Sequence, residues 1–282
     1  MTHIFPISDL HTDFTVNGNV GRRNTLLTEE QLEKMFGFLN DYDDMVVVAC
    51  GDIGERMMGV VWCERMLKVF PKIRIVYTPG NHEYYGANMD ILQHDLSKAT
   101  FSSKRLYILD GQINARCTLT DDLGRPELVV LGGTLWTDFN KQSATVMNDA
   151  QHRMNDYKYI MSGGDNKRIT ANRILNEHFN TRKQIFKELE RVDKTVPVIC
   201  MSHHTPYVDT VQDALTYAYH VDLSEELNNA SRVPTYWFSG HTHMSKVKEI
   251  EYSAGKVTFV SNQWGYPSET ATGYSEHAIF EI

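Results

Sequence analysis

The stretch Met45-Val46-Val47-Val48-Ala49-Cys50-Gly51-Asp52-Ile53-Gly54 decides which class of fold this chain adopts. Its first six residues form a continuous apolar run, which is typical of a strand buried on both faces of a sheet. The run stops at Gly51, where a glycine lets the backbone turn sharply and leaves Asp52 just beyond the strand end. Ligand sites of α/β sheets form at the carboxyl ends of strands, so Asp52 is a candidate functional residue.

Two further segments of the first third repeat this arrangement. Residues 3–8 predict a short strand that runs into Asp9-Leu10-His11, and residues 73–78 predict a strand that runs into Gly80-Asn81-His82-Glu83. Three strands therefore end in loops that carry Asp, His or Asn, and their alternation with helices indicates an α/β (or α+β) protein. We expect two helices between them. The first begins at a capping box formed by Thr28 and Gln31, and the second covers about 56–69.

The rest of the chain divides into a middle part and a last part. Residues 105–119 predict two short strands, and a hairpin turn at 121–124 precedes a strand over 127–131. Residues 137–195 are polar and mostly helical, with one amphipathic face. We interpret them as a helical excursion from a single domain spanning 1–282, because no flexible linker marks their borders; a separate domain is the alternative. The last third predicts strands at 196–201, 235–239, 246–252, 256–261 and 277–282.

The composition excludes several classes of protein. Of the 282 residues, 41% are hydrophobic and 23% are charged, which argues against a disordered, collagen-like or coiled-coil chain. No apolar run reaches 18 residues, and the first ten residues lack the pattern of a signal peptide. The four cysteines show no paired spacing, which is typical of idle thiols in a reducing compartment. We therefore expect a cytoplasmic protein that does not bind membranes.

The net charge bears on possible partners. Lys and Arg number 28 against 36 Asp and Glu, which gives −8 with neutral histidines. Such a field repels nucleic acid at long range, and no stripe of basic residues with interleaved aromatics offsets it. Tight nucleic-acid binding is therefore not expected, whereas bound metal could still create a local cationic site.

Side chains able to bind a cation gather at the ends of the predicted strands. Asp9 and His11 are two residues apart, so an extended backbone directs both to the same side, and His241 and His243 repeat this spacing. Asp, His and Asn together offer the mixed nitrogen and oxygen donors that suit Mn, Fe and Zn better than Mg or Ca. The whole set comprises Asp9, His11, Asp52, Asn81, His82, His203, His241 and His243.

In chain order, these segments resemble the calcineurin-like metallophosphoesterase superfamily. The shared motifs are DxH at 9–11, GDxG at 51–54, GNHE at 80–83, HH at 203–204 and GHTH at 240–243. The resemblance implies the metallo-dependent phosphatase fold, a four-layer αββα sandwich of two mixed sheets flanked by helices. It also implies a dinuclear centre of transition-metal ions, with Mn as the expected metal and Fe or Zn as alternatives.

The resemblance further implies a role for each of these residues. Asp52 would bridge the two metals, and His203 would be a ligand, with its neighbour His204 as the alternative. Asn81 and His82 would act on the phosphate, so Asp52, Asn81 and His82 are the predicted catalytic residues. The remaining assignments place Asp9, His11 and His243 on one metal, and Asn81, His203 and His241 on the other.

The implied activity is hydrolysis of a small phosphomonoester or phosphodiester. Two metals about 3.5–4 Å apart can acidify a water molecule and hold the oxygens of an in-line displacement. His82 is the candidate general acid because imidazole titrates near neutral pH; alternatively it positions the phosphate or hydrogen-bonds its own loop.

Three alternatives to this activity stay open: a nuclease, a phosphoprotein phosphatase and a metal-binding module without catalysis. The family's protein phosphatases typically carry GDxVDRG, whereas residues 51–56 are GDIGER. Relatives that have lost catalysis usually lack metal ligands, and here each expected ligand type is present.

The flanking residues have two interpretations each. Trp136 and Phe139, in the segment 132–139, either line the mouth of the site or belong to the edge of the core. The same choice applies to Tyr84, Tyr85, Trp264 and Tyr266, and Asn155-Asp156-Tyr157 is a candidate to approach the site from the helical excursion. The histidines expected to serve packing or surface roles are His94, His152, His178 and His220.

Overall fold

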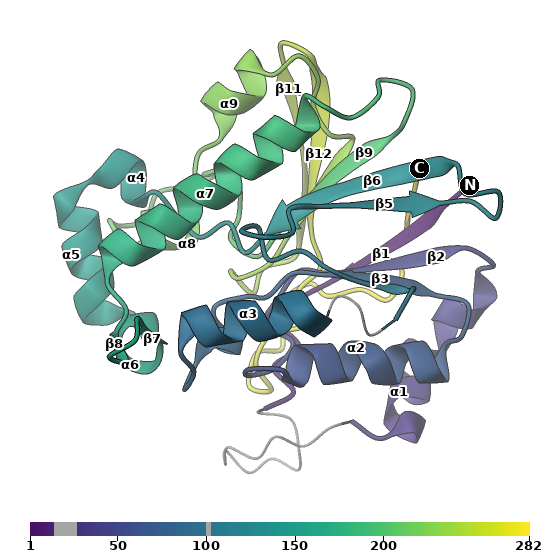
Figure 1. Ribbon diagram of the computed structural model, residues 1–282, viewed down its shortest axis with the longest axis horizontal. Coiled ribbons are helices and arrows are strands. Elements are labelled where there is room, and N and C mark those ends of the chain that lie inside the picture. Colours follow the sequence, from purple (N-terminus) through teal and green to yellow (C-terminus); the bar gives the residue numbers. More distant parts are fainter. Residues whose placement is uncertain (14–26, 100–102) are drawn as a thin grey trace.

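Two mixed sheets lie face to face in the computed structural model, which describes residues 1–13, 27–99 and 103–282 (Figure 1). The first sheet has the order β13-β1-β2-β3-β4 and the second has the order β11-β12-β10-β9-β6-β5. The strands of the first sheet are β1 (His3–Ile7), β2 (Met45–Ala49), β3 (Arg74–Tyr77), β4 (Leu106–Ile108) and β13 (Phe280–Glu281). Those of the second are β5 (Arg116–Thr120), β6 (Pro126–Gly133), β9 (Val198–Ser202), β10 (Tyr236–Ser239), β11 (Lys246–Tyr252) and β12 (Gly255–Ser261).

Strand β2 shows how the layers are built. Val46 and Val48 point between the two sheets, where they pack with side chains of the second sheet such as Phe238. Val47, one residue along, points the other way into a cluster with helix residues such as Trp62. Because alternate residues face opposite sides, a strand covered on both faces requires the unbroken apolar run that the sequence shows.

Helices cover the outer face of each sheet (Figure 1). On the first sheet lie α1 (Glu29–Phe36), the 3₁₀ helix η1 (Gly37–Asp41), α2 (Met58–Val69) and α3 (Met89–Ala99). The capping box predicted at Thr28 is confirmed: Gln31 N donates to Thr28 Oγ1 at 3.2 Å, and Thr28 N donates to Gln31 Oε1 at 2.8 Å. On the second sheet, α7 (Ala171–Leu189) and α9 (Ser224–Asn229) bury Ile185 and Leu227.

The segment 137–195 carries helices and one small hairpin. Besides α7 it contains α4 (Phe139–Gln142), α5 (Ala144–Arg153) and α6 (Asp156–Tyr159), as its helical pattern predicts. The hairpin of β7 (Met161–Ser162) and β8 (Lys167–Arg168) was not predicted, because strands of two residues have no readable periodicity. Two short helices complete the described elements: η2 (His82–Tyr84) and α8 (Thr216–Tyr219).

Parallel pairing brings the loop residues of several strands to one edge of the sandwich. Strand β2 pairs in parallel with both β1 and β3, and β10 pairs in parallel with β9. The two sheets are joined at this edge by hydrogen bonds: Ser8 N donates to Asn262 O at 3.2 Å, and Gly265 N donates to Asp9 O at 2.9 Å. The loops after these strands therefore meet in one place.

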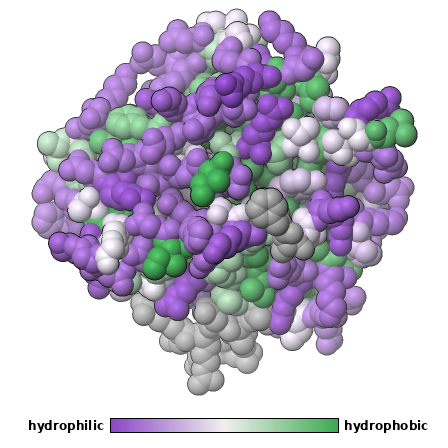
Figure 2. Space-filling view, in the orientation of Figure 1, coloured by the Kyte–Doolittle hydropathy of each residue, from purple (hydrophilic) through white to green (hydrophobic). Residues whose placement is uncertain are grey.

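The surface and the four cysteines show no unusual feature. The face drawn in Figure 2 is mainly hydrophilic, with apolar side chains scattered among polar ones. Among the helices that the structure describes, none has the length and apolar character to span a bilayer. Cys50, Cys63, Cys117 and Cys200 are all buried free thiols, and burial raises the pKa of each.

His178 is a buried packing residue, in line with one of the two roles predicted for it. His178 belongs to α7, and its buried ring has Nδ1 3.1 Å from Leu135 O. Burial, together with the charge of Arg182, lowers its pKa to about 3. The unfolded chain binds a proton here below pH 6.5, whereas the folded chain does so only near pH 3. Stability present above pH 6.5 is therefore lost as the pH falls through this window.

We expect this histidine to contribute a measurable share of acid sensitivity. Between pH 7.5 and 5.0, the wild type should lose about 2 kcal/mol more unfolding free energy than His178→Gln, at about 1.4 kcal/mol per pH unit below the unfolded pKa. Urea titrations at both pH values, with chelator present throughout, measure the difference. Equal losses in the two proteins would show that His178 does not carry the effect.

Candidate metal centre

Five loops place the predicted residues around one point. The loops follow β1, β2, β3, β9 and β10. The side chains of the predicted site residues are buried, except that of His243, which is 13% exposed. The residues contributed, in chain order, are Asp9 and His11, Asp52, Asn81 and His82, His203, and His241 and His243. The structure thus brings together every site residue that the sequence predicts.

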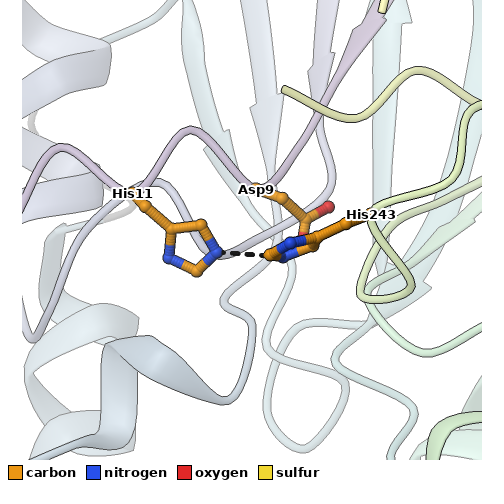
Figure 3. Close-up of side chains that lie close together, drawn as sticks. All are labelled: Asp9, His11 and His243. Atoms are coloured by element: carbon orange, nitrogen blue, oxygen red, sulfur yellow. Dashed lines mark hydrogen bonds and ion pairs between the residues drawn. The ribbon is translucent and has the colours of Figure 1, made fainter. Parts of the chain in front are cut away.

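The first group consists of Asp9, His11 and His243 (Figure 3), whose ligand atoms all lie within 4.8 Å of one another. His11 Nε2 is 3.1 Å from His243 Nε2, which in turn lies 3.4 Å from Asp9 Oδ1. On the other side of its ring, His243 Nδ1 lies 2.5 Å from Glu269 Oε2. Burial opposes charge on this ring, but Asp9 and Glu269 outweigh it and raise the pKa of His243 to about 9. A metal ion would replace the proton at Nε2, while the contact with Glu269 keeps the proton on Nδ1, as in metal-bound histidines.

The second group consists of Asp52, His203 and His241, joined by Asn81. His203 Nδ1 donates to the carbonyl oxygen of Cys50 at 2.8 Å, so its Nε2 faces inward. There it meets Asn81 Oδ1 and His241 Nδ1, each at 3.0 Å. Several acceptor atoms thus point at the same small volume, an arrangement that a cation satisfies.

The carboxylate of Asp52, a member of the second group, also reaches toward the first. Its Oδ1 is 3.4 Å from His203 Nε2, and its Oδ2 is 3.9 Å from His11 Nε2. The same Oδ1 accepts a hydrogen bond from His82 N at 2.9 Å, which fixes the orientation of the carboxylate. This position is the one that a residue shared by two cations needs.

His204 does not take the place of His203. Its ring is buried against Trp136 and His241, with centroid distances of 5.2 and 4.2 Å. Trp136 and Phe139 are also buried, in line with the core-edge alternative for them. Of the two adjacent histidines, His203 is therefore the one within reach of Asp52 and Asn81.

The electrostatics of the metal-free site leave some of its histidines neutral and others charged. Burial lowers the pKa of His11 and His241 well below the usual value, so both rings are neutral. Burial alone would raise the pKa of Asp52, but His203 and His82 outweigh it and hold that pKa well below normal. Burial also opposes charge on His203, yet the Asp52 carboxylate raises its pKa to about 10. The site demands positive charge, which a proton on His203 or a metal ion can supply.

The backbone around these residues is strained in a recurring way. The φ angles of Asp9, His11, Asp52, His241 and His243 lie between 46° and 76°, in the left-handed region. Residues with a Cβ rarely adopt this region, at a cost of about 1–3 kcal/mol each, and such residues cluster at functional sites. The strain directs five polar side chains inward from the ends of straight strands.

Glu83 holds two of these loops in place, a role that the sequence does not predict. Its carboxylate accepts hydrogen bonds from Asp52 N at 2.9 Å, Ile53 N at 2.8 Å and Gly80 N at 2.7 Å. The side chain is fully buried, so these backbone donors replace water. The loop after β2 is thereby fastened to the loop after β3.

A pocket of about 260 Å³ opens beside the histidines. Asp156 reaches it from α6, accepting from Asn81 Nδ2 at 2.8 Å and thereby turning the amide oxygen toward His203. Tyr85 stacks on the ring of His82 at 4.2 Å, and the Tyr266 hydroxyl lies 3.1 Å from His82 Nε2. Asp156, Tyr85 and Tyr266 therefore belong to the site.

The other aromatic residues in question lie away from the pocket. Tyr84 is buried in the core, and Trp264 packs on Tyr274 with the ring centroids 4.6 Å apart. Neither lines the pocket beside the histidines.

Comparison with known proteins agrees with the fold and the clustered ligands. The profile described as calcineurin-like phosphoesterase matches residues 2–245. A fold of this kind with clustered Asp and His side chains defines a metal-dependent hydrolase acting on phosphoester bonds. The chain belongs to the calcineurin-like phosphoesterase family, which confirms the fold class and the activity class implied by the motifs.

Two similar proteins extend the comparison. An uncharacterized protein of Acanthamoeba polyphaga mimivirus is 24% identical, in an alignment covering 98% of this chain and 95% of that protein. The crystal structure of phosphopantetheinyl hydrolase from Mycobacterium tuberculosis superposes with a TM-score of 0.62 at 17% identity. That superposition covers 94% of this chain and 90% of the other, and it shows a shared fold.

The role of Glu83 can be tested by replacing one oxygen of its carboxylate. Glu83→Gln replaces a carboxylate oxygen by an NH₂ group that faces backbone N–H donors, leaving at least one buried donor unpaired at about 1–3 kcal/mol. We expect a loss of unfolding free energy of about 2 kcal/mol or more, measured by denaturant titration without metal. The matched control is Glu33→Gln on the exposed side of α1, expected to change stability by less than about 0.5 kcal/mol. A similarly small change in Glu83→Gln would refute the fastening role.

Proposed function

We propose that this chain binds two transition-metal ions and uses them to hydrolyse a small phosphate ester. The observation that carries this proposal is a pair of inward-facing donor groups linked by the Asp52 carboxylate. A third cluster with ligand spacing, His11, Asp13 and His82, shares His11 with the first group and is not counted as a separate site. Asp52 is the bridging residue, and His203 rather than His204 is the ligand from the second sheet. The full assignment is Asp9, His11 and His243 for one ion, and Asn81, His203 and His241 for the other.

The chain's own residues prepare the reaction at the phosphate. When bound, the two ions supply an acidified water and stabilise the oxygens of an in-line displacement. Asn81, held by Asp156, orients its amide toward the phosphate side of the site. His82 sits at the pocket with Nε2 beside the Tyr266 hydroxyl, where it can hold a proton for the leaving oxygen. Tyr85 fixes the plane of that ring by stacking.

Metal content tests the ligand assignment. We expect about two transition-metal ions per chain by elemental analysis of protein dialysed against trace Mn²⁺. Asp52→Ala should lose the most metal of any single ligand substitution, because Asp52 alone lies beside both groups. The control is Asp122→Ala, in an exposed turn, which should keep full content. Full metal content in Asp52→Ala would overturn the bridging role.

The leaving group tests the role of His82. His82→Ala should keep its metal content, and it should slow hydrolysis of an alkyl phosphate by about 10²–10⁴-fold, because the basic alkoxide needs a proton. Hydrolysis of p-nitrophenyl phosphate should slow far less, because p-nitrophenolate leaves without one. The quantity measured is kcat for both substrates, with His152→Ala on the exposed end of α5 as control. Equal slowing would assign His82 to positioning the phosphate.

A further inference from the structure

A second and larger pocket adjoins the one beside the histidines. It has a volume of about 590 Å³, against about 260 Å³ for the inner pocket. Tyr219, His241 and Thr242 line both, so the two pockets share a wall. We call the larger one the outer pocket; it is bounded by the segment 205–220, by residues 241–246 and by Ser261.

Tyr219 lies at the boundary between the two pockets, against a candidate metal ligand. Its ring packs on that of His241 with a centroid distance of 4.9 Å and an interplanar angle of 30°. Tyr219 and Thr242 therefore lie between the inner pocket and the outer pocket, on the path that a group attached to a phosphate in the inner pocket would take.

The lining of the outer pocket is mixed in polarity. Apolar or aromatic contact comes from Tyr207, Leu215 and Met244. Hydroxyl and amide groups alternate with them, from Thr205, Thr210, Gln212, Thr216, Thr242 and Ser261. Pockets of roughly 300–1,000 Å³ with this mixture are typical of sites for organic molecules that carry a few hydrogen-bonding atoms.

The charges in the outer pocket are already paired. Asp209 forms ion pairs with Lys246 and Lys248, and Asp213 lies 3.4 Å from an Arg153 nitrogen. Among the described residues, every Lys, Arg, Asp or Glu side chain that lines this pocket thus has an opposite partner. Lys246 and Lys248 share the single carboxylate of Asp209, so a second phosphate entering the pocket would have to compete with Asp209 for cations that are already engaged.

From these observations we propose that the outer pocket binds the organic group of the substrate, and that this group is an electrically neutral, hydrogen-bonding moiety of about nucleoside size. The inference rests on the proposed function, since it places the reacting phosphate at the inner pocket. Binding energy from this remote group then raises kcat/KM for esters that carry it. Esters that lack this group, and esters with a second phosphate on it, are poorer substrates.

Three phosphodiesters with the same leaving group test this. They are methyl p-nitrophenyl phosphate, thymidine 5′-(p-nitrophenyl phosphate) and the 3′-phosphorylated form of the thymidine ester. We expect kcat/KM of the Mn²⁺-loaded protein for the thymidine ester to exceed that for the methyl ester by at least ~10-fold, and the 3′-phosphate to remove most of this gain. Equal kcat/KM values for the methyl and thymidine esters would overturn the proposal.

Two variants locate the effect in the outer pocket. Met244→Trp adds bulk to its wall and should lower kcat/KM for the thymidine ester by about 10-fold while leaving the methyl ester within about two-fold. Val247→Trp is the control, because Val247 lies outside the lining and is 59% exposed, against 68% for Met244. Thr210→Lys supplies an unpaired cation and should raise kcat/KM for the 3′-phosphorylated ester, whereas Thr210→Gln should not. No selective change in either Met244→Trp or Thr210→Lys would refute the assignment.

A binding measurement distinguishes failure of this inference from failure of the proposed function. If the wild type turns over none of the three diesters but hydrolyses p-nitrophenyl phosphate, the proposed function holds for monoesters and not for diesters. Calorimetric titration of the same esters into the metal-loaded protein still decides about the outer pocket. Tighter binding of the thymidine ester than of the methyl ester, weakened by Met244→Trp, supports the pocket, and equal binding of the two overturns it.

Discussion

The rest of the structure depends on a cluster of buried lone pairs, whose burial requires a compensating positive charge. Asp9 and Asp52 are buried carboxylates, and neutral imidazoles such as His11 and His241 point into the same volume. Removing such groups from water costs several kcal/mol per charge unless a partner compensates. The proton that Asp52 stabilises on His203 is one compensation, and bound metal is a larger one. The loops, the strained backbone and the flanking hydrogen bonds all serve to keep these atoms together.

The two sheets supply the rigidity that this arrangement needs. Left-handed backbone at five polar residues persists only where the surroundings determine it, and here the strands end inside a doubly covered core. Glu83 fastens the loops within the first sheet, and the hydrogen bond from Gly265 N to Asp9 O ties that sheet to the second. Strain at the site is therefore offset by packing and hydrogen bonding around it.

Much of the fold and of the site could be predicted from sequence because its signals are local. The apolar run at 45–50 specifies a strand buried on both faces, and Asp52 follows it directly, so strand and site residue are read together. The capping box at Thr28 is likewise a matter of residues three apart. Asp156 was a candidate to approach the site, but its hydrogen bond to Asn81 could not be predicted, and neither could the function of Glu83. Glu83 acts through backbone N–H groups whose direction depends on turn geometry, and Asp156 meets Asn81 across 75 residues of chain. Pairwise contacts of that range leave no periodicity in a single sequence.

The distance along the chain between partners also sets when the site can exist. Asp9 lies at the start of the sequence, and its carboxylate accepts from the backbone N–H of His241, 232 residues later. At a synthesis rate of about 5–20 residues per second, roughly 10 to 50 s separate the appearance of these two residues on the ribosome. During that time the first loop lacks the partners that come from the second sheet, so the complete set of ligands exists only after His241 and His243 have been synthesised.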